Sequence, residues 1–310
     1  MPMIRINACG DAPELHLSPR PVWPTLKRAS QTDGPVIIMI HGYKYLPGHS
    51  VHCPHRHLLS LAPEDLPWRS PSWPRQLGFG VGNAGEGLAI AFGWQARGAL
   101  WQAQLRAVSA GRVLARVIRQ LHSDRPDRQV HILAHSMGTE LALEALHHIP
   151  AGAISRVISM TGACHQSRAM TALQTPAGQR TDFVNITSRE NDPFDFLFER
   201  LITPPARGDR ALGHGLQAPN AVTVQLDCPT TLEHLSCLGA NIAPPQFRVC
   251  HWSSYMRPGV LRFYSNLLRR FDEFPLERLR QGLPCETAPR WSRLFAPPRL
   301  PTPLPFLQKA

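Results

Sequence analysis

Short apolar runs alternate with amphipathic segments along most of the chain. Two of the runs, PVIIMI at residues 35–40 and GLAIAFGW at residues 87–94, are rich in aliphatic side chains and too short for ordinary helices. A run that is apolar on both faces is typical of a strand buried in a parallel sheet. Further strands are predicted at residues 129–136, 156–162, 182–188 and 222–227.

The segments between these runs carry a helical period. In residues 99–121, leucine, valine and isoleucine recur at steps of three and four, with arginines at outward positions. Strands and helices that alternate in this way predict an α/β fold, with a mostly parallel central sheet and helices on both faces. Further helices are predicted at residues 139–149, 167–173, 194–202, 231–238 and 258–271.

Proline marks the segments that do not fit this alternation. The chain has 31 prolines, and an interior proline removes a backbone donor from a helix or strand. They concentrate in residues 1–34, 43–85 and 275–310. We interpret these segments as an N-terminal arm, a lid-like insertion packed through Trp68 and Trp73, and a polyproline-like tail around a domain of residues 35–274.

The formal net charge of +11 raises the question of nucleic-acid binding. Only Lys27, Lys44 and Lys309 are lysines, so nearly all of the 33 basic residues are arginines, and they are scattered rather than clustered. This pattern favours a general preference for arginine over a phosphate-binding surface, and we expect no nucleic-acid partner.

Seven cysteines without a CxxC pair, and an N-terminus without an apolar secretory core, favour a reduced, cytoplasmic protein. We expect these cysteines to be small buried side chains rather than bridges. No apolar stretch approaches the ~20 residues that a membrane span requires. The oligomeric state stays open.

The candidate chemistry centres on Ala134-His135-Ser136-Met137-Gly138, between a predicted strand and a predicted helix. A tight strand-to-helix turn exposes the serine hydroxyl and needs small residues two positions before and after it. The N–H groups at the start of the helix favour a developing negative charge there. We therefore expect Ser136 to be a nucleophile.

A second element supports the same chemistry. The strand at residues 35–40 ends in His41-Gly42, and the backbone N–H of Tyr43 follows beside the predicted serine turn. Together with the N–H of Met137, it predicts a two-donor oxyanion hole. We interpret His41 as structural.

In these motifs, IIMIHGY and HILAHSMG, and in the order of its strands, the chain resembles α/β-hydrolases over roughly residues 35–270. Ala134 replaces the first glycine of the usual serine motif. The resemblance implies a serine hydrolase whose nucleophile, acid and histidine follow in that order.

The resemblance places the acid in the loop after residues 182–188. Asp192 is the preferred candidate, and Glu190 and Asp195 are its rivals. The carboxylate would hold the histidine in the tautomer that leaves Nε2 free to act as a base. All three acids could instead be solvated loop charges.

The histidine is expected in the loop before the last predicted helix, where His251 lies. His214, in a GHG segment, is the second candidate, and His234, inside a helical pattern, is the third. We expect Ser136, Asp192 and His251 to hydrolyse a carboxylic ester or related acyl bond of a small molecule through an acyl-enzyme, without a cofactor.

Two alternatives remain open at this stage. The first is a non-catalytic binding protein on the same scaffold, since the fold alone does not establish catalysis.

The second alternative is a metal site in the segment GHSVHCPHRH, where His49, His52, Cys53, His55 and His57 resemble zinc ligands. Their spacing matches no closed four-ligand pattern, so we expect no metal. The tryptophans of residues 43–85 suggest an apolar substrate group.

Overall fold

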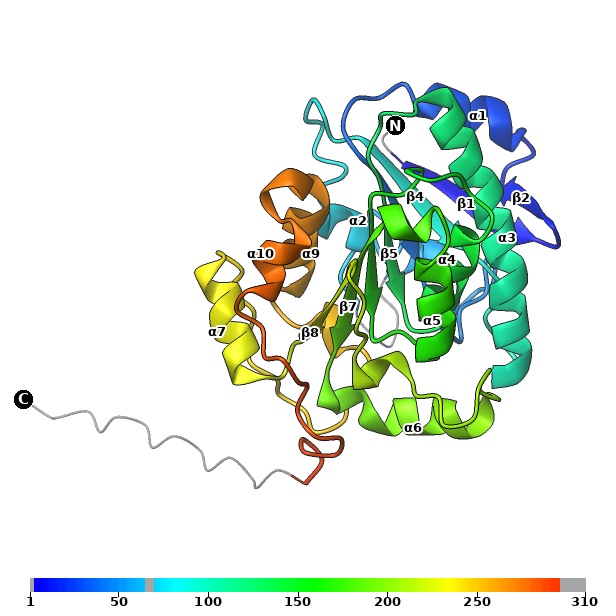
Figure 1. Ribbon diagram of the computed structural model, residues 1–310. Coiled ribbons are helices and arrows are strands. Elements are labelled where there is room, and N and C mark those ends of the chain that lie inside the picture. The colour runs from blue at the N-terminus through cyan, green and yellow to red at the C-terminus, as the bar shows by residue number, and fades with distance from the viewer. Residues whose placement is uncertain (1–2, 65–69, 296–310) are drawn as a thin grey trace, which may run out of the picture.

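One eight-stranded sheet organises the computed structural model, which describes residues 3–64 and 70–295 (Figure 1). The strand order is β2-β1-β4-β3-β5-β6-β7-β8. β2 is antiparallel to β1, and all other neighbouring strands are parallel. The strands are β1 (Met3–Cys9), β2 (Ala12–Leu15), β3 (Val36–Ile40), β4 (Leu88–Gly93), β5 (Val130–His135), β6 (Arg156–Met160), β7 (Asp182–Thr187) and β8 (Ala221–Gln225).

Helices cover both faces of the sheet, so the predicted α/β class is confirmed. Figure 1 shows α1, α3, α4 and α5 on one face and α2, α9 and α10 on the other, with α6 below one end of the strands. The helices are α1 (Val22–Ala29), α2 (Trp73–Gln76), α3 (Leu100–Asp124), α4 (Gly138–Leu146), α5 (Gln166–Leu173), α6 (Asp192–Leu201), α7 (Pro229–Cys237), α8 (Ser253–Met256), α9 (Val260–Arg269) and α10 (Leu276–Arg280).

The central strand β3 shows how the sequence produces two cores. Val36, Ile38 and Ile40 belong to the hydrophobic cluster that includes α3 and α4. Ile37 and Met39 belong to the second cluster, which includes α9. Successive side chains of a strand point to opposite faces, so a strand between two helical layers must be apolar throughout.

The N-terminal segment differs from the expected arm. β1 pairs in parallel with β4, and β2 pairs with β1 at the edge of the sheet. Met3, Ile4 and Ile6 are buried, whereas Arg5 between them is exposed. β1 lies near the edge of the sheet and one of its faces is partly open, so its apolar pattern is short and interrupted. A pattern of this kind is a weak signal in the sequence.

The insertion at residues 43–85 packs against the sheet. Trp73 begins α2 and is fully buried, together with Leu58 and Leu59, in the cluster that includes α9. Packing through Trp73 was expected, and Trp68 lies outside the described residues. The described residues of this insertion therefore complete one of the two cores.

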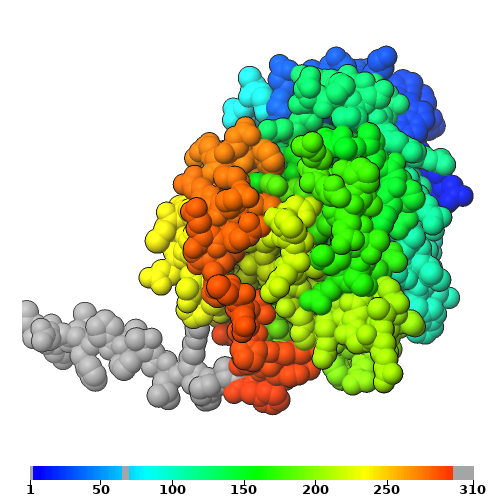
Figure 2. Space-filling model, viewed as in Figure 1, coloured from blue at the N-terminus to red at the C-terminus, as the bar shows by residue number. Residues whose placement is uncertain are grey.

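The C-terminal segment contains one short helix, α10, where an extended tail was expected. The described residues beyond it run along the surface toward α6 (Figure 2). Arg290 donates to Glu199 of α6 at 2.7 Å, and this contact fixes the segment on the domain. Residues 296–310, which hold most of the predicted polyproline run, lie outside the described residues.

All seven cysteines are free thiols. Cys53 and Cys164 are buried as expected, but Cys9, Cys237 and Cys285 are exposed. Among the helices of the described chain, none combines the length and apolar character that crossing a bilayer requires.

Candidate active site

Ser136 occupies a strained turn between β5 and α4. Its φ is 53°, in the left-handed region that non-glycine residues rarely adopt. β5 ends at His135 and α4 begins at Gly138, so the turn is as tight as the motif predicted. A Cβ on Gly42 would lie 2.8 Å from the Ser136 Cβ, so the loop after β3 approaches the serine as only glycine permits.

His251 lies within hydrogen-bonding distance of the serine. Its Nε2 is 3.0 Å from Ser136 Oγ, and its Nδ1 is 2.6 Å from Oδ1 of Asn191. Ser136 and His251, predicted as partners from separate loops, therefore come together. The partner of His251 Nδ1 is the side-chain amide of Asn191 rather than a carboxylate.

Asp195 orients the Asn191 amide. Asn191 Nδ2 donates to Asp195 Oδ1 at 2.9 Å, which leaves Asn191 Oδ1 facing the histidine. An amide oxygen only accepts hydrogen bonds, so His251 must carry its proton on Nδ1. Nε2 is then free to accept a proton from the Ser136 hydroxyl, which is the tautomer that a general base requires.

The structure does not bring Asp192 to His251. The Asp192 Oδ1 lies 3.2 Å from the Arg189 guanidinium, and its Oδ2 accepts from the Trp291 N–H at 2.6 Å. Asp192 is the first residue of α6, and one helical step turns a side chain by about 100°. This rotation directs Asp192 away from the position that Asn191, directly before the helix, occupies.

The two rival acids, Glu190 and Asp195, have partners other than the His251 imidazole. Glu190 is buried in an ion pair with Arg257, and its backbone oxygen accepts from the Cys250 N–H at 2.9 Å. It therefore supports the loop that carries His251. Asp195 contacts the histidine only through Asn191.

Several contacts fix the position of His251. The His135 ring nitrogen Nε2 lies 3.3 Å from the His251 backbone oxygen, and the Thr161 hydroxyl donates to the same oxygen at 3.4 Å. The ring of Phe194 stacks on the imidazole with centroids 4.8 Å apart. His251 is thus held from its backbone and from one ring face.

The other candidate histidines have different partners. His214 Nε2 lies 3.3 Å from Glu199 Oε1, and His234 Nε2 lies 3.0 Å from the Leu279 backbone oxygen. Neither lines the cavity at Ser136. Within the described residues, His251 alone of the three candidates pairs with the serine.

Burial changes the pKa values of two side chains in the site, His251 and Asp195. Burial, reinforced by the nearby Lys44 ammonium, lowers the pKa of His251 to about 4. Burial also raises the pKa of Asp195 to about 7, despite the opposing attraction of Arg189. At neutral pH the imidazole is therefore neutral and able to accept the serine proton.

The two expected oxyanion donors line the cavity beside Ser136. In the described part of the chain, the backbone N–H groups of Tyr43 and Met137 have no protein acceptor. The neighbouring His41 is fully buried, and its Nε2 accepts from the Trp94 backbone N–H at 3.1 Å. These contacts agree with a structural role for His41.

Ser136 opens into a cavity of ≈ 450 Å³. Its walls are mainly apolar and aromatic, and they come from α3, α6 and the loop around Trp252. Apolar lining side chains include Leu100, Trp101, Phe194, Leu197, Phe198 and Leu201. This is the composition of a site for a small molecule with an apolar group.

The histidine- and cysteine-rich segment at residues 49–57 has no metal-like arrangement. His55 Nε2 lies 2.7 Å from Asn7 Oδ1, and the Tyr45 hydroxyl lies 2.6 Å from His57 Nδ1. Across residues 3–64 and 70–295, no group of three or more histidine, cysteine or acidic side chains is arranged to hold a metal ion.

Comparison with known proteins agrees with this architecture. Residues 24–162 match a family described as an alpha/beta hydrolase of unknown function, DUF900. This match and the mostly parallel sheet show that the chain is an α/β-hydrolase in fold. The matched region includes Ser136 but ends before Asn191 and His251. A search of curated proteins finds no match.

Asn191 was not predicted from the sequence, because a carboxylate was expected as the partner of the histidine. One signal was available in the chain: Asn191 and Asp195 are four residues apart, and the helix predicted at residues 194–202 only has to begin three residues earlier to bring them onto one face. Side chains at this spacing share a helix face and form hydrogen bonds. An amide backed by an acid was therefore a readable alternative.

Proposed function

We propose that the protein is a serine hydrolase that cleaves a carboxylic ester or related acyl bond of a small molecule. Ser136 is the nucleophile, His251 the general base, and Asn191 holds the imidazole. The proposal is supported by a chain of three contacts. Ser136 Oγ lies 3.0 Å from His251, His251 lies 2.6 Å from Asn191, and Asn191 lies 2.9 Å from Asp195.

In the first half-reaction, Ser136 Oγ attacks the carbonyl carbon of the substrate and its proton passes to His251 Nε2. The N–H groups of Tyr43 and Met137 donate to the oxyanion of the tetrahedral intermediate. His251 then gives the proton to the departing alkoxide, so that an alcohol leaves and the acyl group stays on Ser136.

In the second half-reaction, His251 takes a proton from water, whose oxygen attacks the acyl carbon. Collapse of the second intermediate releases the carboxylic acid, and the proton returns to Ser136 Oγ. Asn191 differs from a carboxylate because it does not offset the positive charge on the imidazolium. Asp195, one hydrogen bond further away, supplies a compensating negative charge at a greater distance when its carboxyl group is ionised.

A fluorophosphonate probe with an alkyl chain tests the proposal, because such probes phosphonylate activated serines. Wild-type protein should be labelled on Ser136, and Ser136→Ala should abolish the labelling. His251→Ala should slow it by about 100-fold or more, because the general base is lost. Labelling that persists in Ser136→Ala would contradict the assignment of the nucleophile.

A non-catalytic binding protein is the second candidate function. One observation favours it: the neutral side chain of Asn191 contacts His251 where an acidic side chain was expected. In that case, no ester is hydrolysed and the probe leaves Ser136 unmodified. The mainly apolar cavity would then bind its ligand unchanged.

A further inference from the structure

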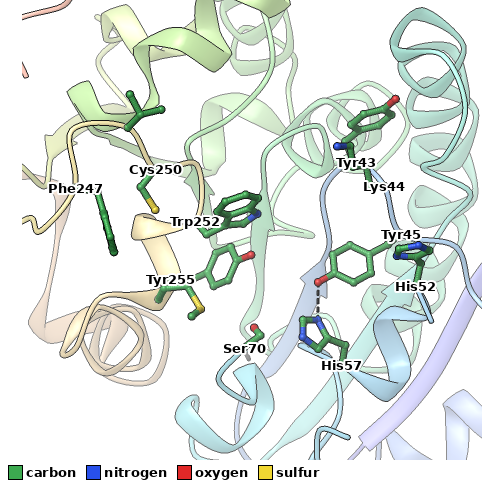
Figure 3. A pocket seen from close by; sticks show the side chains of 12 residues that line it. Tyr43, Lys44, Tyr45, His52, His57, Ser70, Phe247, Cys250, Trp252 and Tyr255 are labelled. Carbon is green, nitrogen blue, oxygen red and sulfur yellow. Dashed lines mark hydrogen bonds between the residues drawn. The ribbon is translucent and has the colours of Figure 1, made fainter. Parts of the chain in front are cut away.

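A second cavity adjoins the one at Ser136. It measures ≈ 580 Å³ and is drawn in Figure 3. Tyr43, Lys44, Tyr45, Trp252 and Tyr255 line both cavities. We call the first the serine cavity and the second the side cavity. The two cavities are therefore neighbours on either side of these shared residues.

The shared wall carries a cation without an acidic partner. Lys44 is exposed, and no carboxylate within the described residues forms an ion pair with it. No acidic side chain is among the described residues that line the side cavity. Burial lowers the pKa of His52, and the charges of Arg97 and Lys44 lower it further. The side cavity is therefore electropositive.

The position of Lys44 is set by its backbone. Its φ of 75° lies in the left-handed region, its N–H donates to the Ala96 oxygen at 2.8 Å, and Arg97 donates to its carbonyl at 3.3 Å. A strained conformation that is fixed on both sides is costly and persists where the surrounding structure enforces it. The ammonium is therefore presented from a defined point next to Tyr43.

The hydroxyl of Tyr255 faces the same space. Tyr255 is 5% exposed, and within the described residues its hydroxyl has no hydrogen-bond partner. Burial raises the pKa of Tyr255 well above its usual value, so the hydroxyl remains a donor. Figure 3 shows it pointing across the side cavity toward Tyr45, whose own hydroxyl pairs with His57. Because Tyr255 lines the side cavity, its hydroxyl is available to donate to an acceptor on a ligand there.

We propose that the side cavity binds a carboxylate of the substrate, held by the Lys44 ammonium and the Tyr255 hydroxyl, while an apolar group occupies the serine cavity. The inference rests on the proposed hydrolase function and narrows its substrate to an acidic, amphipathic ester. One ammonium and one hydroxyl match the two oxygens of a carboxylate better than the three terminal oxygens of a phosphate.

Binding of this carboxylate also affects the base. Lys44 contributes to the low pKa of His251, after the larger effect of burial. A substrate anion beside Lys44 offsets that contribution, because an opposite charge compensates the ammonium field. The imidazole then becomes a stronger base when an acidic substrate is bound.

Matched esters test the proposal. The substrates are p-nitrophenyl esters of adipic, suberic and sebacic acid, each with the remote carboxyl either free or methylated. Wild type should hydrolyse the free acid with about tenfold higher kcat/KM than the methyl ester for at least one chain length. Lys44→Met should bring the ratio of kcat/KM for the free acid to kcat/KM for the methyl ester close to one, and Lys44→Arg, which keeps the charge, should retain the preference.

Tyr255→Phe gives an independent variant, because it removes only the hydroxyl. It should reduce the ratio of kcat/KM for the free acid to kcat/KM for the methyl ester severalfold. Equal rates for both esters at every chain length would overturn the proposal. A Lys44→Met variant that slows both esters equally would do the same.

A binding measurement separates this inference from the proposed function. Ser136→Ala protein is titrated with 4-phenylbutyrate and with its methyl ester, with tryptophan fluorescence as the readout. Tighter binding of the acid, lost in Ser136→Ala/Lys44→Met, supports the carboxylate site even if wild type hydrolyses no ester. Ser136-dependent hydrolysis without any preference for the acid in either assay overturns the carboxylate site alone.

Discussion

The amide at Asn191 makes a specific prediction about the pH dependence of catalysis. In Asn191→Asp, a carboxylate replaces the amide oxygen 2.6 Å from His251 Nδ1. Asp195, whose pKa is raised to about 7 by burial, would keep its proton and donate it to the new acid. The pair would therefore carry one negative charge next to the imidazole.

The size of the effect follows from this contact. An opposite charge in direct contact raises the pKa of a histidine by about 1–3 units. The pKa of His251 would rise from about 4 to between about 5 and 7. A base must be deprotonated to act, so activity is lost as pH falls through this pKa. The acid limb of the variant should lie at higher pH than that of wild type.

The assay is kcat/KM for a p-nitrophenyl ester between roughly pH 3.5 and 9. Asn241→Asp is the control, because it makes the same chemical change at an exposed residue whose side chain pairs with Ser236. The control should keep the wild-type acid limb. Superimposable acid limbs for wild type and Asn191→Asp would refute the claim that Asn191 is the direct partner of His251.

Three further predictions concern stability and the geometry of the serine turn. Burial raises the pKa of Asp195 from 3.8 to about 7, which costs up to about 4 kcal/mol of stability above pH 7. Asp195→Asn should therefore raise the melting temperature at pH 8 but not at pH 4; equal shifts at both pH values would contradict this. His131 is buried with neither ring nitrogen bonded within the described residues, and burial lowers its pKa to about 3. Stability should fall as pH drops from about 6.5 toward 3, and His131→Leu should flatten this slope in urea titrations; an unchanged slope would count against it. Gly42→Ala places a methyl group 2.8 Å from the Ser136 Cβ, and should lower kcat about 100-fold with little change in overall fold by circular dichroism; full activity would refute the close approach.

Much of the fold was predictable because its signals are local. A strand buried on both faces, such as β3, is apolar at every position, and β5 departs from this only at His131 and His135, so both strands could be recognised in the sequence. The serine turn between β5 and α4 imposes small residues at defined spacing, so Ser136 could be recognised. β1 was missed because its half-open face permits Arg5 within the strand.

The partner of the histidine was harder to predict, because it depends on orientation. Asn191 and Asp192 are adjacent in sequence, but they point in different directions at the start of α6. Spacing along the chain locates a loop to within a few residues and does not determine which side chain faces His251. The arrangement of Lys44 and Tyr255 around the side cavity likewise depends on packing between distant segments.

Acylation of Ser136 with His251 as the base is the step on which the proposed function depends. Its most direct test is an acid-quenched reaction with a slowly deacylating p-nitrophenyl ester, followed by mass spectrometry of the digested protein. We expect a burst of about one p-nitrophenolate per chain and the acyl mass on the peptide that contains Ser136. Steady release without a burst, together with unmodified Ser136 or an acyl group on another residue, would contradict it.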